Sequence, residues 1–144
     1  MKTNWVICMY LDSNVLIFAA LDNGQFGSDA NKLLRMVREG QIKASISPMV
    51  LNEVMRASQK ALGREQADKI VTGIMLIPFS WLDIGYGCIH YARRHFKNGL
   101  DPTDAFHAAI MNEYNLSLIV TEDSHFDNVE GIKRNSIREA LTKK

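Results

Sequence analysis

Short apolar segments alternate with longer segments of helical periodicity along this chain. Each short segment is bounded by polar or turn-forming residues and is too short for a helix, which predicts strands. The first of them is almost uninterruptedly apolar, as in a strand that is covered on both faces of a parallel sheet. The five predicted strands are 5–11, 42–46, 76–81, 116–120 and 132–134, and Pro78 limits pairing in the third.

The segments between the strands carry apolar residues at spacings of three and four, which predicts amphipathic helices. One packing helix is expected from Ala67, Ile70, Val71, Ile74 and Met75. Helix starts are predicted from residues that can cap a helix or occupy its first position. These are Ser28, Ser47 with Pro48, Asp83, Asp101 with Pro102, and Ser136 with Glu139 as a capping box.

Alternation of strands and helices predicts an α/β fold around a parallel sheet. The 144 residues, 47% of them hydrophobic and 23% charged, are expected to form one globular domain, residues 1–144. No apolar run approaches the ~20 residues of a membrane span, and the start lacks a signal peptide, so we expect a cytoplasmic protein. Cys8 and Cys88 have no ligand spacing, which argues against zinc, and a net charge of +1 gives no global nucleic-acid signature.

Acidic residues follow two of the predicted strands. Asp12 ends the first strand, and Thr121, Glu122, Asp123 and Asp127 follow the fourth. Carboxyl ends of parallel strands border the crevice where such sheets bind ligands, so these residues are candidates for a site. Asp12 also has a simpler explanation, because either Asp12 or Asn14 can cap the helix that follows.

Two further acids lie on predicted helices. Asp104 is the third residue of the helix that Asp101 and Pro102 open, and Glu53 lies beside an apolar stripe. Asp104 could merely complement the helix dipole, and Glu53 could be a solvated acid. Asp101 is best explained as a cap.

Asp12, Glu53, Asp104 and Asp123 are therefore predicted to converge on one edge of the sheet. Four carboxylates at close range repel one another unless a hard cation neutralises them. Oxygen ligands without cysteine favour Mg²⁺ or Mn²⁺. A basic run of Arg93, Arg94, His95 and Lys97 precedes Asp104; it is either a solvated helix end or a device that steers RNA phosphates.

The segments LDSNVLI around Asp12, SPMVLNEV around Glu53, and PTDAFHAA with LIVTEDSHFD resemble the PIN-domain family and, within it, the VapC-type toxin ribonucleases. The resemblance implies a three-layer α/β/α fold and a metal-dependent endoribonuclease whose acidic site is Asp12, Glu53, Asp104 and Asp123, with Asp127 as an optional addition. It also implies that Asn14 and Thr121 orient the acids. His107 resembles a histidine common in this helix, and we interpret it as a packing or hydrogen-bonding residue.

This family resemblance implies hydrolysis by an activated water, with 5′-phosphate and 3′-hydroxyl products. It further implies an antitoxin partner, and the apolar helices suggest a homodimer. The alternatives are a PIN nuclease that is not a toxin, a scaffold that binds RNA or protein without cutting, and a haloacid-dehalogenase-like phosphatase. Asn14 argues against the phosphatase, because that mechanism needs a carboxylate at this position. No GxGxxG or GxxxxGK[ST] loop supports a nucleotide-binding fold.

Overall fold

The computed structural model describes residues 8–142, and within them the chain forms one parallel sheet of five strands. The order is β3-β2-β1-β4-β5, so β1 lies at the centre. The strands are β1 (Cys8–Leu11), β2 (Lys43–Ile46), β3 (Ser80–Trp81), β4 (Leu118–Val120) and β5 (Lys133–Asn135). The predicted first residues of β1, 5–7, lie outside the described residues.

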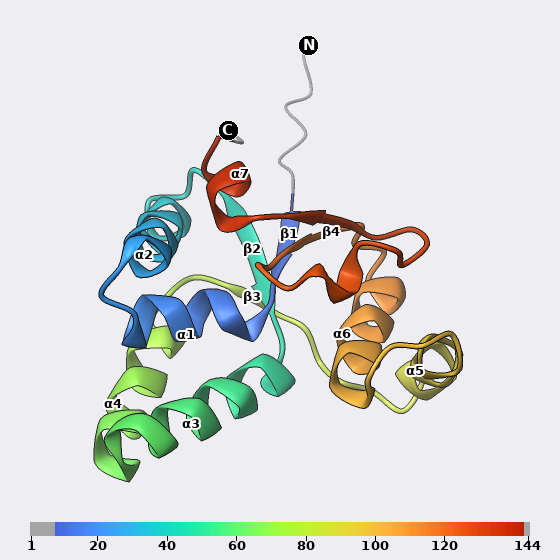
Figure 1. Cartoon of the computed structure of the whole chain (residues 1–144), viewed down its shortest axis with the longest axis horizontal. Helices are drawn as coiled ribbons and strands as arrows, with labels where there is room; N and C mark the ends of the chain where they lie inside the picture. The colour runs from blue at the N-terminus through green and yellow to red at the C-terminus, as the bar shows by residue number, and fades with distance from the viewer. Residues whose placement is uncertain (1–7, 143–144) are drawn as a thin grey trace.

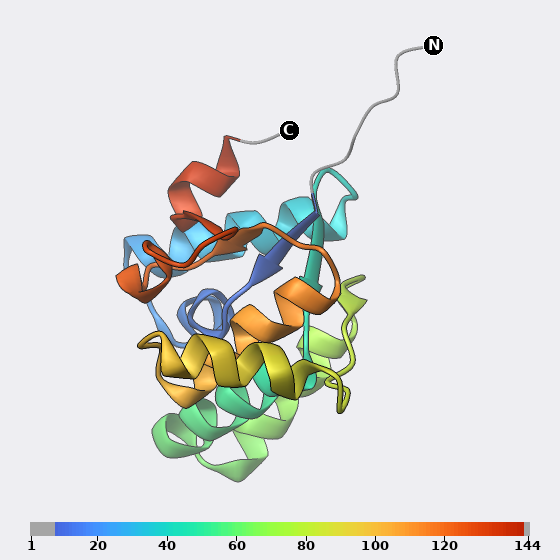
Figure 2. The same ribbon diagram turned by 90° about the vertical axis from the view of Figure 1, so that its right-hand side faces the viewer.

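Helices cover both faces of the sheet, which confirms the predicted three-layer α/β/α arrangement. In Figure 1, α1 and α2 lie on one side of the strands and α5 and α6 on the other, and Figure 2 shows α5 as the outer helix of that pair. The helices are α1 (Ser13–Leu21), α2 (Gln25–Arg38), α3 (Pro48–Leu62), α4 (Arg64–Met75), α5 (Cys88–Lys97), α6 (Pro102–Glu113) and α7 (Ile137–Leu141), with a 3₁₀ turn η1 (Ser124–Phe126).

The central strands carry side chains that are buried on both faces of the sheet. Met9, Tyr10 and Leu11 of β1 are at most 1% exposed, and Ile119 and Val120 of β4 are fully buried. Such burial explains why these strands are continuous apolar runs rather than alternating ones. No helix of the described residues is long and apolar enough to cross a membrane.

Two predicted helix starts are confirmed in detail. The Ser47 hydroxyl caps α3 with Pro48 in its first turn, and Ser136 with Glu139 forms the reciprocal capping box of α7. Asp101 occupies the predicted N-cap position of α6, but its side chain makes no capping hydrogen bond.

Two other predicted helix starts are wrong. The helix assigned to Ser28 begins earlier, at Gln25, because the Asp22 carboxylate accepts the hydrogen bond of the Gly27 N–H at 2.8 Å and takes over the capping role. Asp83 caps no helix, since α5 begins only at Cys88. The Asp83 backbone N–H instead donates to the Tyr114 hydroxyl at 3.1 Å.

The other departures concern the edges of the sheet and of α4. The third strand shrinks to Ser80 and Trp81, since Pro78 lacks the N–H that pairing requires. On α4, Ala67, Val71 and Ile74 are buried as predicted, but Met75 at the helix end is 62% exposed.

Candidate active site

The candidate site lies where the connections of the sheet change direction. The chain leaves the central strand β1 towards β2 on one side, whereas β4 pairs with β1 on the other. In open α/β sheets this switch point leaves a crevice at the carboxyl ends of the strands. Asp12 follows β1 directly and Thr121 follows β4, and the Asp12 N–H donates to the Val120 carbonyl at 3.1 Å.

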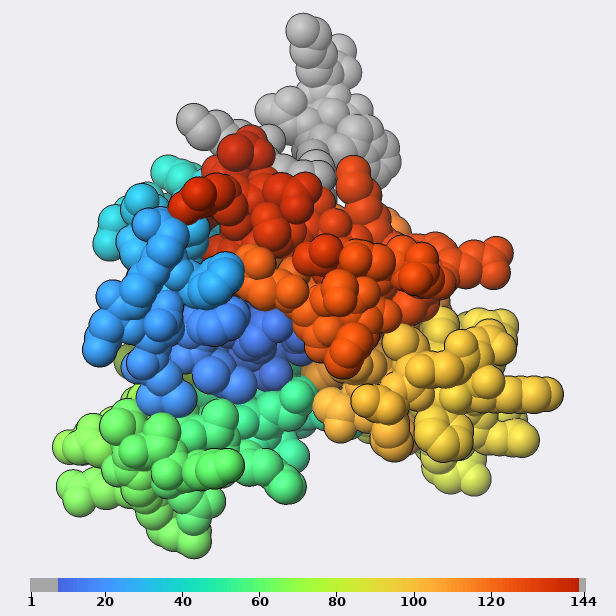
Figure 3. All heavy atoms as spheres, in the orientation of Figure 1, coloured from blue at the N-terminus to red at the C-terminus, as the bar shows by residue number. Residues whose placement is uncertain are grey.

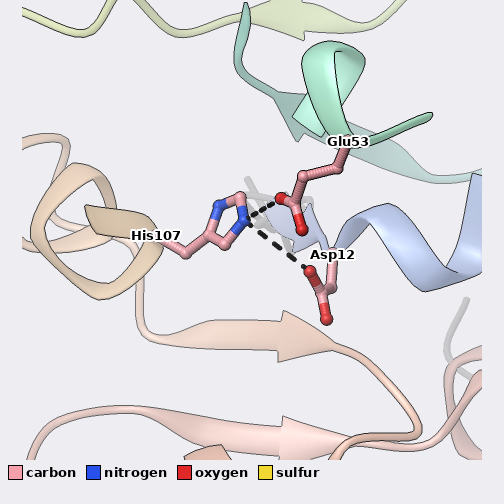
Figure 4. A group of neighbouring side chains, drawn as sticks. All are labelled: Asp12, Glu53 and His107. Atoms are coloured by element: carbon pink, nitrogen blue, oxygen red, sulfur yellow. Dashed lines mark hydrogen bonds and ion pairs between the residues drawn. The ribbon is translucent and has the colours of Figure 1, made fainter. Parts of the chain in front are cut away.

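A first cluster contains Asp12, Glu53 and His107 (Figure 4). One ligand atom from each lies within 4.8 Å of the other two. His107 Nε2 is 2.5 Å from Glu53 Oε1 and 3.8 Å from Asp12 Oδ1. Asp12 is 6% exposed and His107 is fully buried, whereas 29% of the Glu53 side chain is exposed, so solvent reaches the cluster at Glu53.

A chain of buried hydrogen bonds holds Glu53 in place. Burial raises the pKa of Tyr10, so its hydroxyl stays protonated. That hydroxyl lies 2.9 Å from Ser47 Oγ and 2.7 Å from His107 Nδ1. A carboxylate only accepts hydrogen bonds, so His107 Nε2 carries the proton and donates to Glu53. His107 Nδ1 shares a hydrogen bond with the Tyr10 hydroxyl, which is also bonded to the Ser47 hydroxyl.

Asp12 is held by a separate set of donors. The Ser13 N–H donates to Asp12 Oδ1 at 2.8 Å, and the Thr121 hydroxyl donates to Oδ2 at 2.8 Å. Thr121 Oγ1 accepts in turn from Asn14 Nδ2 at 2.8 Å and from the Asp123 N–H at 3.0 Å. Asn14 and Thr121 therefore have the contacts that their expected orienting role requires.

A second cluster contains Asp104, Asp123 and His125 and is more open to solvent. His125 Nδ1 lies 3.2 Å from Asp104 Oδ2 and 3.0 Å from Asp123 Oδ2. The His125 side chain is 59% exposed, against 16% for Asp104 and 32% for Asp123. His125 Nδ1 thus lies between the two carboxylates, where a cation could otherwise sit.

The two clusters interact electrostatically. Burial raises the pKa of Asp12, and the charge of Glu53 adds to this effect, while His107 and Thr121 oppose it. Burial likewise raises the pKa of Asp104, and the charges of Asp12 and Asp123 raise it further against the His125 bond. The hydrogen bond to Asp104 raises the pKa of His125. Repulsion among the four acids is therefore a property of the folded chain.

The donor set of these clusters fits a hard divalent cation. In each cluster the three ligand atoms lie within 4.8 Å of one another, and two of the three belong to carboxylates, whose oxygens are the ligands that a hard divalent cation prefers. In addition, the buried Asn14 Oδ1 has no hydrogen-bond partner among the described residues. It is a further acceptor beside Asp12 for a water molecule of such an ion.

The structure divides the predicted site residues in a way that the sequence did not indicate. The four acids reach one edge, but as two groups, each containing a histidine. Asp127 belongs to neither group, because both its oxygens accept from Arg134. His125 was not predicted; it stands two residues after Asp123 in a family-like segment, which was the available signal. Arg93, Arg94 and Lys97 lie on α5, as expected.

Comparisons with known proteins identify the domain family and the fold. The family model of the PIN domain matches residues 9–132. No curated protein matches the chain.

Several solved structures share the fold. VapBC2 from Rickettsia felis, bound to a DNA fragment from the promoter, has a TM-score of 0.72 and 16% identity over 90% of this chain and 98% of that one. DNA-bound VapBC from Salmonella typhimurium has a TM-score of 0.71 and 18% identity over 92% of this chain and 99% of that one. VapC20 from Mycobacterium tuberculosis, a toxin that cleaves the sarcin-ricin loop, has a TM-score of 0.68. Its sequence is 12% identical over 83% of this chain and 92% of that one.

Proposed function

Because this chain belongs to the PIN-domain family, we propose that it is an Mg²⁺- or Mn²⁺-dependent endoribonuclease and the toxin of a toxin–antitoxin pair. One observation carries the proposal: four carboxylates from separate elements lie at the switch point of a parallel sheet, in two groups whose ligand atoms lie within 4.8 Å of one another. The cleavage of the sarcin-ricin loop by the similarly folded VapC20 supports RNA as the substrate.

We assign the catalytic, metal-holding roles to Asp12, Glu53, Asp104 and Asp123. When bound, a divalent cation lowers the pKa of a coordinated water and stabilises charge on the leaving oxygen. The protein contributes orientation. His107 fixes Oε1 of Glu53 and the Ser13 hydroxyl, at 3.1 Å, fixes Oε2. Donors so arranged keep the ligand oxygens in place before the ion arrives, which lowers the reorganisation needed on binding.

Asp104 and Asp123 have a different task in this proposal. Their side chains are partly exposed, and within residues 8–142 these two carboxylates are the only side chains that the His125 ring hydrogen-bonds or ion-pairs. Release of His125 frees oxygens of both carboxylates for the cation. The second half of the site is thereby open to substrate from solvent.

The proposed partners are an antitoxin and a second copy of the chain. VapBC structures with similar folds support an antitoxin, and an arginine placed among the acids would match their charge and geometry. Exposed apolar side chains on α3 and α4 support self-association: Met55, Leu62 and Met75, with Leu76 just after α4. Light scattering at high micromolar concentration tests this dimer. We place the activity in the cytoplasm, where its proposed RNA substrate resides.

The test of the enzyme is cleavage of 5′-labelled RNA in Mn²⁺, Mg²⁺ or EDTA. We expect products with 5′-phosphate and 3′-hydroxyl ends in either metal and none in EDTA. RNA binding without cleavage would contradict the nuclease and favour a scaffold. Hydrolysis of a phosphate monoester without RNA cleavage would favour a phosphatase. For the toxin, growth arrest on expression of the chain, absent with Asp12→Asn, is the expected result.

A further inference from the structure

A polar cleft of about 620 Å³ lies beside the second acidic cluster. Its wall includes Arg94, Asn98, Asn112, His125, Asn128 and Glu130. In Figure 3 the yellow atoms of α5 lie next to the orange atoms of the segment after β4, the two regions that border it. A volume of this size accommodates one or two nucleotides, since small-ligand sites span about 300–1,000 Å³.

The cleft continues into the acidic cluster. A smaller pocket of about 180 Å³ is lined by Gly99, Leu100, Asp101, Asp104 and His125. Gly99, Leu100 and His125 also line the larger cleft. A chain with one phosphate at Asp104 would therefore have its next nucleoside in the larger cleft.

The contacts of the residues that line this cleft show which of them can donate hydrogen bonds to a ligand and which can accept them. The buried His95 lies with Nε2 2.5 Å from Asn112 Oδ1. An amide oxygen only accepts, so His95 donates and Asn112 keeps its two Nδ2 hydrogens for another partner. The Arg94 guanidinium lies 5.3 Å from the Tyr91 ring centroid. No ion pair occupies Arg94 or Glu130 within residues 8–142.

These groups match one nucleobase better than the others. Arg94 and Asn112 supply donors only, as the O6 and N7 acceptors of guanine require. Glu130 supplies acceptors for the guanine N1–H and N2–H groups. Adenine would instead direct its 6-amino group at those donors. We propose that the cleft binds an unpaired guanine next to the scissile phosphate and sets the sequence preference of cleavage; this rests on the proposed ribonuclease function.

The test uses single-stranded RNA oligonucleotides that differ at one position, which is G, A, C, U or inosine. Inosine lacks only the 2-amino group of guanine. We expect cleavage in Mn²⁺ next to G with kcat/KM about tenfold higher than next to the other bases, inosine included. In Glu130→Gln, the G and inosine substrates should be cut within about twofold of each other, because the paired acceptors are gone. Glu65→Gln, an exposed glutamate on α4, is the matched control and should keep the preference.

Fluorescence anisotropy of the same RNAs in EDTA separates this inference from the nuclease proposal. G-selective binding that Glu130→Gln abolishes supports the guanine site even if no cleavage occurs. Cleavage without base preference, or a preference that survives in both Glu130→Gln and Asn112→Ala, overturns the guanine site and leaves the ribonuclease intact.

Discussion

Each of the two acidic clusters contains two carboxylates and one histidine, yet their surroundings differ. In the first, His107 is fully buried and hydrogen-bonded on both ring nitrogens. In the second, His125 is 59% exposed and one ring nitrogen faces both carboxylates. Buried networks of satisfied hydrogen bonds rigidify a site, whereas an exposed pair is readily exchanged. On the proposed function, we therefore expect the first cluster to hold an ion and the second to admit one together with substrate.

The largest expected effect comes from removing one acid of either cluster. Asp12→Asn and Asp104→Asn should each lower RNA cleavage more than about 100-fold, because losing even a group that orients a metal ligand costs about 10–100-fold. In EDTA neither variant should melt below the wild type, since the change relieves repulsion. RNA cleavage in Mn²⁺ and thermal melts check both statements.

Asp101→Asn is the matched control for these two variants. It lies three residues before Asp104 and makes no capping hydrogen bond, so its activity should stay within about twofold of the wild type. An active Asp104→Asn together with an inactive Asp101→Asn would overturn the assignment on α6. Activity in both Asp12→Asn and Asp104→Asn would remove the acidic-site mechanism itself.

The next effect tests whether the first cluster is held by its histidine. His107→Leu removes the donor to Glu53 and should lower Mn²⁺ affinity and kcat/KM by about 10–100-fold. His107→Gln can place an amide N–H near the position of Nε2 and should recover part of that loss. Isothermal titration with Mn²⁺ and RNA kinetics are the measurements, and equal behaviour of the two variants would mean that His107 only fills space.

A pH series in EDTA compares the two clusters by stability. The pKa values of Asp12 and Asp104 are raised above 3.8, so the folded state binds these protons more tightly than the unfolded state. Each group therefore lowers the free energy of unfolding as pH rises through its folded pKa, the reverse of a salt-bridged acid. The Tm of Asp12→Asn relative to wild type should increase from about pH 4 to pH 7. A relative Tm that falls over this range would contradict unfavourable burial of Asp12.

The smallest effect is expected from Asp127, the acid outside both clusters. Its carboxylate binds Arg134, and this bond lowers its pKa. Asp127→Asn should leave RNA cleavage within about twofold of the wild type and lower Tm only slightly, as for most surface pairs. A loss of cleavage similar to that of Asp123→Asn would show that Asp127 takes part in the reaction.

Periodicity was enough to predict the parallel sheet, and strand ends were enough to predict the edge at which the acids lie, whereas the three layers were implied by the resemblance to the PIN-domain family. A contiguous apolar run such as that of β1 predicts a strand buried on both faces, and this prediction places Asp12 at the carboxyl end of the strand. The pairing of the acids could not be predicted, because it depends on side-chain directions. His107 is one turn beyond Asp104 on α6, yet it points to Glu53 of α3. Ser28 and Asp83 failed for a similar reason, as the side chains of Asp22 and Tyr114 met the local hydrogen-bonding needs instead.

The pairing of β1 with β4 has a consequence for the protein during its synthesis. The oxygens of Asp12 are fixed in part by Thr121, a residue 109 positions later in the chain. Asp104, Asp123 and β4 also come from the last third. A ribosome that has made the first hundred residues thus carries a nascent chain without a site. Contacts of such sequence separation form late in folding, so we expect the proposed nuclease activity to arise only when translation is nearly complete.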